Sequence, residues 1–106
     1  MKQSVNHFSC LAVDMGAGSI RIMLGSIKDK QIDYKEIHRF SNEIIEIDGH
    51  DRWDISAIFS EILEGVKKAI AKSADLPVSI GVDTWGADFV LLNENGELID
   101  TPIAYR

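Results

Sequence analysis

Residues 10–25 read CLAVDMGAGSIRIMLG and decide the fold. The apolar run Cys10–Val13 ends at the acidic residue Asp14, and the small residues Gly16–Ser19 follow it as a turn. Across Ile20–Ile27, apolar residues alternate with others, which is typical of a strand with one buried face. The stretch therefore predicts two strands joined by a glycine-rich turn.

A third strand and a helix extend this unit. The cluster Lys28–Lys30 predicts a turn before a strand over about Gln31–Phe40, and the residues from there through His50 have the character of an unpatterned loop. Apolar residues then recur at helical spacing across Ile55–Ile70. Asp54 precedes them and is a good N-cap, because its carboxylate can accept from a free backbone N–H of the first turn.

Two further strands follow the helix. Pro77 closes the helical region, and the apolar run Val78–Val82 again ends at an aspartate, Asp83. Phe89–Leu92 reads as another strand, followed by the Asn-Gly type of hairpin turn at Asn93–Gly96. Strands, a crossover helix and a further strand predict an α/β fold with a sheet of mixed direction.

With 106 residues, the chain is one small domain or a piece of a larger one. We expect a polar lead-in over residues 1–9 and a single folded unit over residues 10–106. Because Pro102–Arg106 stops within an apolar segment, we expect this unit to be incomplete.

Composition excludes several classes of protein. Hydrophobic residues make up 45% and charged residues 26%, and the net charge of −6 leaves no basic footprint for nucleic acid. A single cysteine, Cys10, excludes an intrachain disulfide and cannot alone build a zinc site. No run approaches the roughly 18 apolar residues of a membrane span, and the N-terminus lacks an apolar signal core. We therefore expect a cytoplasmic protein that binds neither membrane nor nucleic acid.

The first aspartate and its turn can bind phosphate and metal. A carboxylate at the end of a buried strand needs partners, and hydrated Mg²⁺ is a suitable one. Gly16 and Gly18 let the backbone approach a ligand and aim N–H groups at an anion. Ser19 can donate a hydroxyl, and Arg21 can neutralise phosphate charge. The alternative is a plain hairpin with an acidic cap; the loop matches neither a Walker A nor a Rossmann pattern.

The second aspartate repeats this logic. Ligands of open α/β sheets gather outside strand ends, so we expect Asp14 and Asp83 to face one crevice. Trp85 can lie against the apolar face of a sugar ring, and Gly86 lets a backbone amide reach a hydroxyl. The alternative places Trp85 in the core and makes Asp83 a cap of the following turn. Elsewhere, we expect surface or loop positions for the scattered histidines His7, His38 and His50.

Four stretches of the chain resemble sugar kinases of the FGGY family. They keep the family's order from Cys10 to Arg106, and the last, with its DTWGADFVLL run, indicates the narrower group that acts on L-rhamnulose. The stretches are VDMGAGSIRIMLG (13–25), EIHRFSN (36–42), RWDISAIFSEILEGV (52–66) and SIGVDTWGADFVLLNENGELIDTPIAYR (79–106).

This resemblance implies a ribonuclease-H-like fold, shared with actin and the heat-shock ATPases, of which the chain would be the N-terminal part of the first domain. It implies transfer of the ATP γ-phosphoryl group to the 1-hydroxyl of L-rhamnulose, giving L-rhamnulose 1-phosphate in rhamnose breakdown. Asp14 would hold hydrated Mg²⁺, and Gly86 would contact the sugar. The phosphate-contacting loop would comprise Ala17, Gly18, Ser19, Ile20 and Arg21.

The chain departs from the family at two points. The family's loop usually reads alanine-serine-serine-glycine-arginine, so Gly18 replaces a hydroxyl and Ile20 replaces a glycine. The aspartate general base of the family, in a histidine-aspartate-threonine stretch, and the adenosine pocket are expected beyond Arg106. We therefore expect the chain alone to be inactive and to self-associate through its incomplete edge. Two other hypotheses are a fragment of another actin-like ATPase and a non-enzymatic α/β interaction module.

Overall fold

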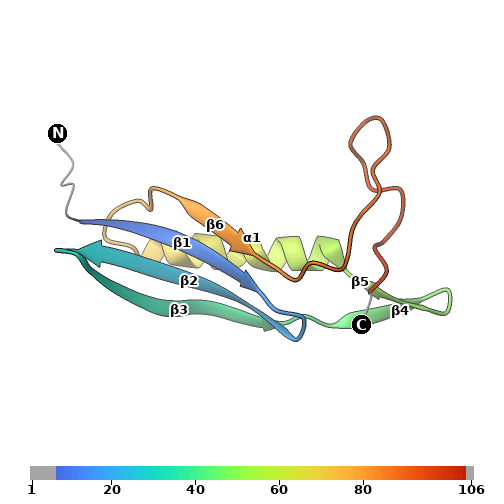
Figure 1. Cartoon of the computed structure of the whole chain (residues 1–106), viewed down its shortest axis with the longest axis horizontal. Coiled ribbons are helices and arrows are strands. Elements are labelled where there is room, and N and C mark those ends of the chain that lie inside the picture. The colour runs from blue at the N-terminus through green and yellow to red at the C-terminus, as the bar shows by residue number, and fades with distance from the viewer. Residues whose placement is uncertain (1–6, 105–106) are drawn as a thin grey trace.

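The computed structural model describes residues 7–104. A four-stranded sheet in the order β3-β2-β1-β6 forms one layer, and the long helix α1 covers one of its faces (Figure 1). A separate two-stranded sheet lies beyond one end of the first. The elements are β1 (His7–Met15), β2 (Ser19–Lys28), β3 (Gln31–Ser41), β4 (Ile44–Ile47), β5 (His50–Trp53), α1 (Ile55–Lys72) and β6 (Ile80–Asp83).

The direction of the strands confirms the predicted mixed sheet. β1, β2 and β3 pair antiparallel through short turns, whereas β6 returns parallel to β1 after the crossover through α1. A parallel neighbour requires such a crossover, and a helix is its usual form. The predicted α/β class is therefore confirmed.

The core lies between α1 and the covered face of the sheet. Alternation along β2 puts Ile20, Ile22 and Leu24 on this face, and Leu11 and Val13 of β1 lie beside them. Ile20 and Ile22 have no exposed surface. Burial of an aliphatic side chain of this size contributes about 1.5–3 kcal/mol, so this small cluster supplies much of the fold's stability.

Helix α1 begins where the sequence predicts it. The Oδ1 atom of Asp54 accepts a hydrogen bond from the backbone N–H of Ala57 at 3.1 Å, which confirms Asp54 as the N-cap. Only part of the predicted apolar stripe is covered: Ile58 is buried against the sheet, whereas Phe59 is 60% exposed. Leu63 and Ile70 of the same stripe are also exposed.

Gly65 lets the helix approach the sheet closely. A Cβ atom at this position would lie 2.4 Å from Cγ1 of Ile22 and 3.0 Å from Cδ2 of His38. These distances are shorter than side chains tolerate in a packed interior. The close packing of α1 on β2 and β3 therefore depends on a residue without a side chain.

The segment expected to be a loop before the helix is instead the β4–β5 hairpin. Its turn consists of Asp48 and Gly49, both in the left-handed region, with φ of 54° and 78°. Asp-Gly is a strong hairpin-turn signal, and the isoleucines Ile44, Ile45 and Ile47 precede it, so the prediction of an unpatterned loop was wrong. β1 also begins earlier than predicted, at His7, so residues 7–9 belong to the strand.

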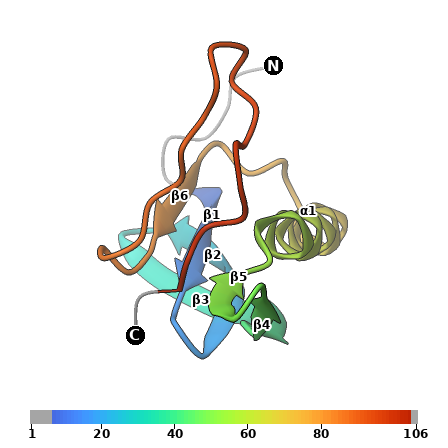
Figure 2. The ribbon, with the colours of Figure 1, turned by 90° about the vertical axis from the view of Figure 1, so that its right-hand side faces the viewer.

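The predicted strand Phe89–Leu92 is absent from the described structure. The chain instead makes a long excursion after β6, which projects away from the sheet (Figure 2). Only the isolated bridge between Leu92 and Leu98 pairs its two arms, because the apolar run has no neighbouring strand. The predicted turn at its tip is confirmed: the N–H of Gly96 donates to the carbonyl of Asn93 at 3.0 Å.

The excursion returns to the hairpin at its base. The N–H of Trp53 donates to the carbonyl of Pro102, and the N–H of Ala104 donates to the carbonyl of Asp51, both at 2.9 Å. These two hydrogen bonds hold the returning end of the excursion against β5.

Within the part of the chain that the structure describes, no helix combines the length and the apolar character needed to cross a membrane.

Candidate active site

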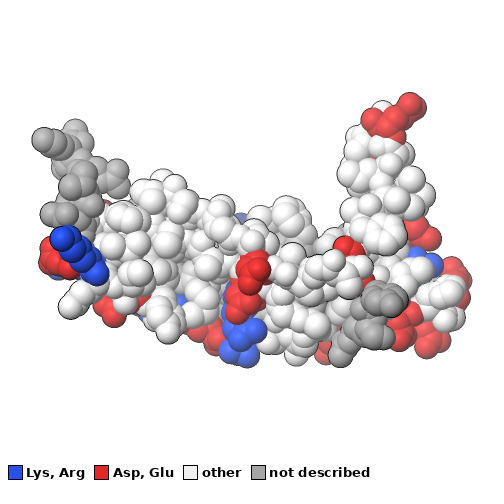
Figure 3. Space-filling view, in the orientation of Figure 1, with Lys and Arg blue, Asp and Glu red and all other residues white. Residues whose placement is uncertain are grey.

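Four charged residues form a row across the face of the sheet that α1 leaves uncovered. Asp83 on β6 is in register with Asp14 on β1, Asp14 with Arg21 on β2, and Arg21 with Arg39 on β3. Residues in register on neighbouring strands point to the same face. Figure 3 shows a column of acidic and basic side chains crossing an otherwise largely uncharged face. The row brings two carboxylates together and places two guanidinium groups beside them.

The two aspartates that the sequence singled out lie at the carboxyl ends of adjacent parallel strands. Neighbouring strands are about 4.8 Å apart, so the two carboxylates share one edge of the sheet. Asp83 is exposed, and the Asp14 side chain is 48% exposed, so both are accessible to a ligand. No cluster of three or more acidic, histidine or cysteine side chains among the described residues forms a closed metal site.

A hydrated divalent cation fits this pair without a third protein ligand. Mg²⁺ usually keeps several waters and takes one or two carboxylates together with substrate phosphates. The donor set at this edge consists of carboxylate oxygens only, which suits a hard cation. Asp14 and Asp83 therefore have the chemistry and the placement for hydrated Mg²⁺.

Arg21 has hydrogen-bonding capacity to spare for an anion. Its Nε atom lies 3.4 Å from Oδ2 of Asp14 in an ion pair. The same nitrogen is buried and has no hydrogen-bond partner among the described residues. A buried donor of this kind is costly unless a ligand satisfies it, and a phosphate oxygen would do so.

The turn between β1 and β2 lies at the same edge. The N–H of Gly16 donates to the carbonyl of Ser19 at 2.9 Å, and a Cβ atom at Gly16 would approach that oxygen to 2.9 Å. A Cβ atom at Gly18, by contrast, would have no described atom within 4 Å. Gly16 is therefore required by the turn itself, whereas Gly18 leaves open space beside it. The Ile20 side chain is in the core, so only its backbone can contact a ligand.

Asn42 holds this turn in place, although no motif in the sequence marks it as a site residue. Its Nδ2 donates to the carbonyl of Gly16 at 3.2 Å, and its backbone N–H donates to the carbonyl of Gly18 at 3.1 Å. The residue is only 4% exposed. The only signal in the sequence was a polar residue shortly after the third predicted strand, which does not indicate contact with a turn 26 residues earlier.

Arg39 completes the row and was also not predicted. It donates two hydrogen bonds to Oε1 of Glu36, at 2.9 and 2.7 Å, and its Nη1 lies 3.5 Å from Oγ of Ser19. The hydrogen bond from Arg39 lowers the pKa of Glu36, with a smaller contribution from the charge of Arg21. The pKa of Arg39 is raised in turn by Glu36 and by the charge of Asp14. Arg39 is therefore linked electrostatically to Glu36 beside it and to Asp14 of the row.

Trp85, the predicted sugar platform, packs against Trp53. The two ring centroids are 4.9 Å apart with an interplanar angle of 46°. Both indole N–H groups donate to the same oxygen, Oδ2 of Asp88, which the sequence analysis did not single out. Trp53 is 2% exposed, whereas Trp85 is half-buried, so Trp85 has both a packing partner and an accessible part. Gly86 is exposed, and a Cβ atom there would meet no described atom within 4 Å.

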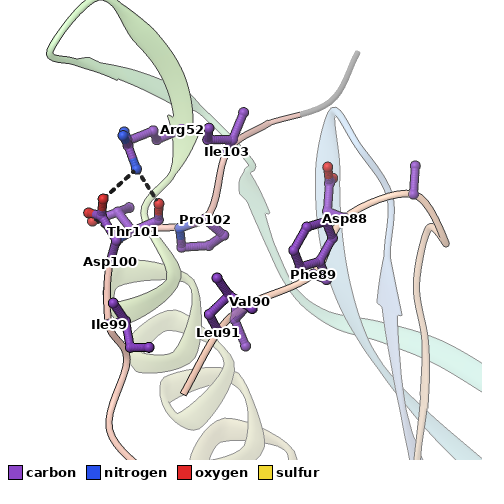
Figure 4. Close-up of a pocket in the computed structure, with 11 residues that line it drawn as sticks. Arg52, Asp88, Phe89, Val90, Leu91, Ile99, Asp100, Thr101, Pro102 and Ile103 are labelled. Carbon is purple, nitrogen blue, oxygen red and sulfur yellow. Dashed lines mark hydrogen bonds and ion pairs between the residues drawn. The ribbon is translucent and has the colours of Figure 1, made fainter. Parts of the chain in front are cut away.

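Two hollows adjoin these residues. A cavity of about 230 Å³ lies between the indoles, the end of β1 and the start of α1, with Met15 and Thr84 in its wall. A larger hollow of about 400 Å³ opens between the two arms of the excursion (Figure 4). It is mostly apolar, and Arg52 lies at one end, where it bonds the Thr101 carbonyl and pairs with Asp100 at 3.4 Å.

His38 is not the surface or loop residue that we predicted. Its Nε2 lies 2.8 Å from Oε2 of Glu61, and Lys68 Nζ lies 3.1 Å from its Nδ1, so it joins β3 to α1. The side chain is only 13% exposed. His50 in β5 is exposed, and the His7 side chain, 3.7 Å from Asp75, is 40% exposed, so the predicted surface position is confirmed for these two. None of the three contacts the row of charges.

Known proteins with similar sequences test the predicted resemblance. The chain is 48% identical to the rhamnulokinase of Lactiplantibacillus plantarum over 98 residues, which are 92% of this chain and 20% of that protein. It is 43% identical to the rhamnulokinase of Klebsiella pneumoniae, over 97% of this chain and 21% of that protein. The chain is similar to rhamnulokinases along nearly its whole length. It spans about a fifth of the length of these curated relatives.

Solved structures confirm the fold. A gluconate kinase from Lactobacillus acidophilus matches with a TM-score of 0.76 at 16% identity, over 92% of this chain and 19% of that one. A ligand-bound xylulose kinase from the same organism matches with a TM-score of 0.72 at 18% identity, over 90% of this chain and 19% of that one. No family model matches the chain. The predicted likeness to FGGY sugar kinases, and to rhamnulokinases among them, is thus confirmed.

Proposed function

We propose that the chain is part of an ATP-dependent kinase that phosphorylates the 1-hydroxyl of L-rhamnulose, giving L-rhamnulose 1-phosphate for rhamnose breakdown. The observation that carries the proposal is the row Asp83-Asp14-Arg21-Arg39 beside the glycine turn. The names of the relatives supply the substrate, since they are rhamnulokinases at up to 48% identity. Because ATP is the phosphoryl donor, we place the reaction in the cytoplasm.

The acidic and basic residues would have different roles in this reaction. Asp14, with Asp83 beside it, would hold hydrated Mg²⁺, which supplies charge neutralisation at the phosphates. Arg21 and the backbone N–H groups of Ala17–Ile20 would bind phosphate oxygens, while Ser19 offers its hydroxyl. Phosphoryl transfer depends on positioning and on neutralising charge more than on covalent chemistry, so this set suits the reaction.

The sugar would lie at the end of β6. We propose that Asp83, the exposed part of Trp85 and the backbone of Gly86 contact the ketose. The open space at Gly86 supports this, because a side chain there would occupy the room that a ligand needs. We assign no general base to the described residues and expect it in the part of the kinase beyond Arg106, together with the adenosine pocket.

The test compares a parent protein of the relatives' length with the 106-residue chain. With γ-labelled ATP, Mg²⁺ and a panel of ketoses, we expect the parent to label L-rhamnulose selectively and the chain alone to show no turnover. Asp14→Asn in the parent should lower kcat/KM on the order of 100-fold. Asp33→Asn, an exposed aspartate of β3 at the other end of the sheet, is the matched control and should leave kcat/KM unchanged.

Two results would contradict the proposal. Hydrolysis of ATP by the parent without any phosphorylated ketose would favour the actin-like ATPase hypothesis. A parent that neither hydrolyses ATP nor is protected by a ketose against thermal unfolding would favour the interaction module.

A further inference from the structure

Both tryptophans of the chain donate to one carboxylate oxygen of Asp88. The proposed function gives this arrangement no role. Nε1 of Trp53 donates to Oδ2 of Asp88 at 2.7 Å, and Nε1 of Trp85 donates to the same atom. Hydrogen bonds to an ionised acceptor are stronger than those between neutral groups. Asp88 therefore joins two aromatic side chains that come from distant parts of the chain.

The two indoles differ in what fixes them. Trp53 ends β5, is 2% exposed and directly precedes the N-cap of α1, so the core holds it firmly. Trp85 follows β6 in a segment without regular structure, and its neighbours Thr84 and Gly86 are exposed. Trp53 is thus held by the core. Through its hydrogen bond with Trp85, Asp88 connects the irregular segment Thr84–Gly86 to Trp53.

This segment lies between the row of charges and the small cavity. Asp83, at the end of the row, directly precedes it, and Thr84, Trp85 and Asp88 line the cavity of about 230 Å³. Met15, the residue after Asp14, lines the same cavity. A shift of Trp85 would therefore move the backbone at Gly86 relative to both aspartates.

We propose that Asp88 is a positioning residue for the ketose: by accepting from Trp53 and Trp85, it fixes the Thr84–Gly86 segment beside Asp14 and Asp83. This inference rests on the proposed function, because it takes Gly86 to be a ketose contact. Holding a binding group in place before the ligand arrives lowers the entropy that binding must otherwise remove. The effect should appear in the KM for the ketose and not in that for ATP.

The first part of the test is spectroscopic and uses the 106-residue chain. Since these are its only two tryptophans, indole signals report on this pair alone. In ¹H–¹⁵N NMR spectra, Asp88→Asn should shift both indole N–H resonances upfield and move the backbone amide of Gly86. Asp33→Asn should move none of them. Unchanged indole resonances in Asp88→Asn would overturn the inference without reference to any sugar.

The second part measures kinetics in the parent protein. Asp88→Asn should raise the KM for L-rhamnulose about tenfold, the loss expected for a weakened charge-assisted hydrogen bond, and leave the KM for ATP unchanged. Trp85→Phe, which keeps a ring and removes the N–H, should raise the same KM and carries the test if Asp88→Asn does not fold. Both KM values should stay at the wild-type level in Asp33→Asn.

The outcomes separate the two proposals. Active Asp88→Asn and Trp85→Phe parents with unchanged ketose KM would overturn the positioning role and leave the proposed function intact. A wild-type parent that phosphorylates no ketose would overturn the proposed function together with the ketose role of Asp88. If the parent phosphorylates no ketose, the indole shifts would show only that Asp88 is hydrogen-bonded to the two tryptophans.

Discussion

At the scale of single residues, the row Asp83-Asp14-Arg21-Arg39 places four charges side by side on a largely uncharged face of the sheet (Figure 3). The protein carries a net charge of −6, so its overall field repels a triphosphate. The two arginines counter this field locally. Arg21 pairs with Asp14, and Arg39 lies beside Arg21 in register. For the proposed binding of a triphosphate, the local arrangement of charges therefore matters more than the net charge.

The Glu36–Arg39 pair gives a titration test of this row. Because the hydrogen bond from Arg39 lowers the pKa of Glu36, protonation is harder in the folded state than in the unfolded chain. The pair's stabilisation is therefore present above pH 4.5, the ordinary value, and is lost as the pH falls through the lower folded pKa. We expect an NMR titration to place the Glu36 midpoint below 4.5.

Arg39→Gln serves as the comparison for that titration. It removes the charged donor, so the pKa of Glu36 should rise toward its ordinary value. An unchanged midpoint in the variant would show that Arg39 does not contact Glu36 in solution.

At the scale of elements, the packing of α1 depends on Gly65. Alanine is the better helix former by about 1 kcal/mol, but overpacking a core costs about 1–3 kcal/mol. Ile22, which the new Cβ would meet, has no exposed surface and belongs to the core cluster. We expect Gly65→Ala to lower the free energy of unfolding, by up to about 2 kcal/mol, measured by urea denaturation.

Gly18→Ala is the matched control for Gly65→Ala. Its Cβ would meet no described atom within 4 Å, so stability should stay within about 0.5 kcal/mol of the wild type. A higher unfolding free energy for Gly65→Ala would mean that α1 lies farther from β2 than the structure shows.

The sequence predicted those parts of the fold and site that follow from local pattern. Two apolar runs ending in aspartate predicted that Asp14 and Asp83 would share an edge, and strand polarity alone is enough to place them there. Asn42, Arg39 and Asp88 were missed because their roles depend on hydrogen bonds between segments far apart in the chain. The β4–β5 hairpin is different, because its turn signal, Asp48-Gly49, is local and was present in the sequence.

At the scale of the whole molecule, the two edges of the main sheet differ. β3 carries Asp33, Lys35, Glu36 and Arg39, and charged side chains discourage pairing with another chain. β6, at the other edge of the described sheet, exposes Ile80 and Val82 at 54% and 63%. The predicted self-association therefore finds its support at β6.

We expect the 106-residue chain to sediment with a concentration-dependent increase in mass. Val82→Lys should abolish this increase, since it places a charge at the apolar edge. Ile32→Lys, at an equally exposed position of β3, is the control and should leave it unchanged. A wild-type chain that stays monomeric at all concentrations would contradict the proposed self-association.

The hydrogen bonds at Trp53 and Ala104 hold the returning end of the excursion against β5, and its tip extends beyond them (Figure 2). The turn at Asn93–Gly96 projects into solvent, with its polar backbone satisfied within the turn. Exposed turns of this kind accept inserted residues most readily. An epitope or a fluorophore could thus be introduced between Asn95 and Gly96, giving a handle for immobilising or labelling the protein at a distance from its charged row.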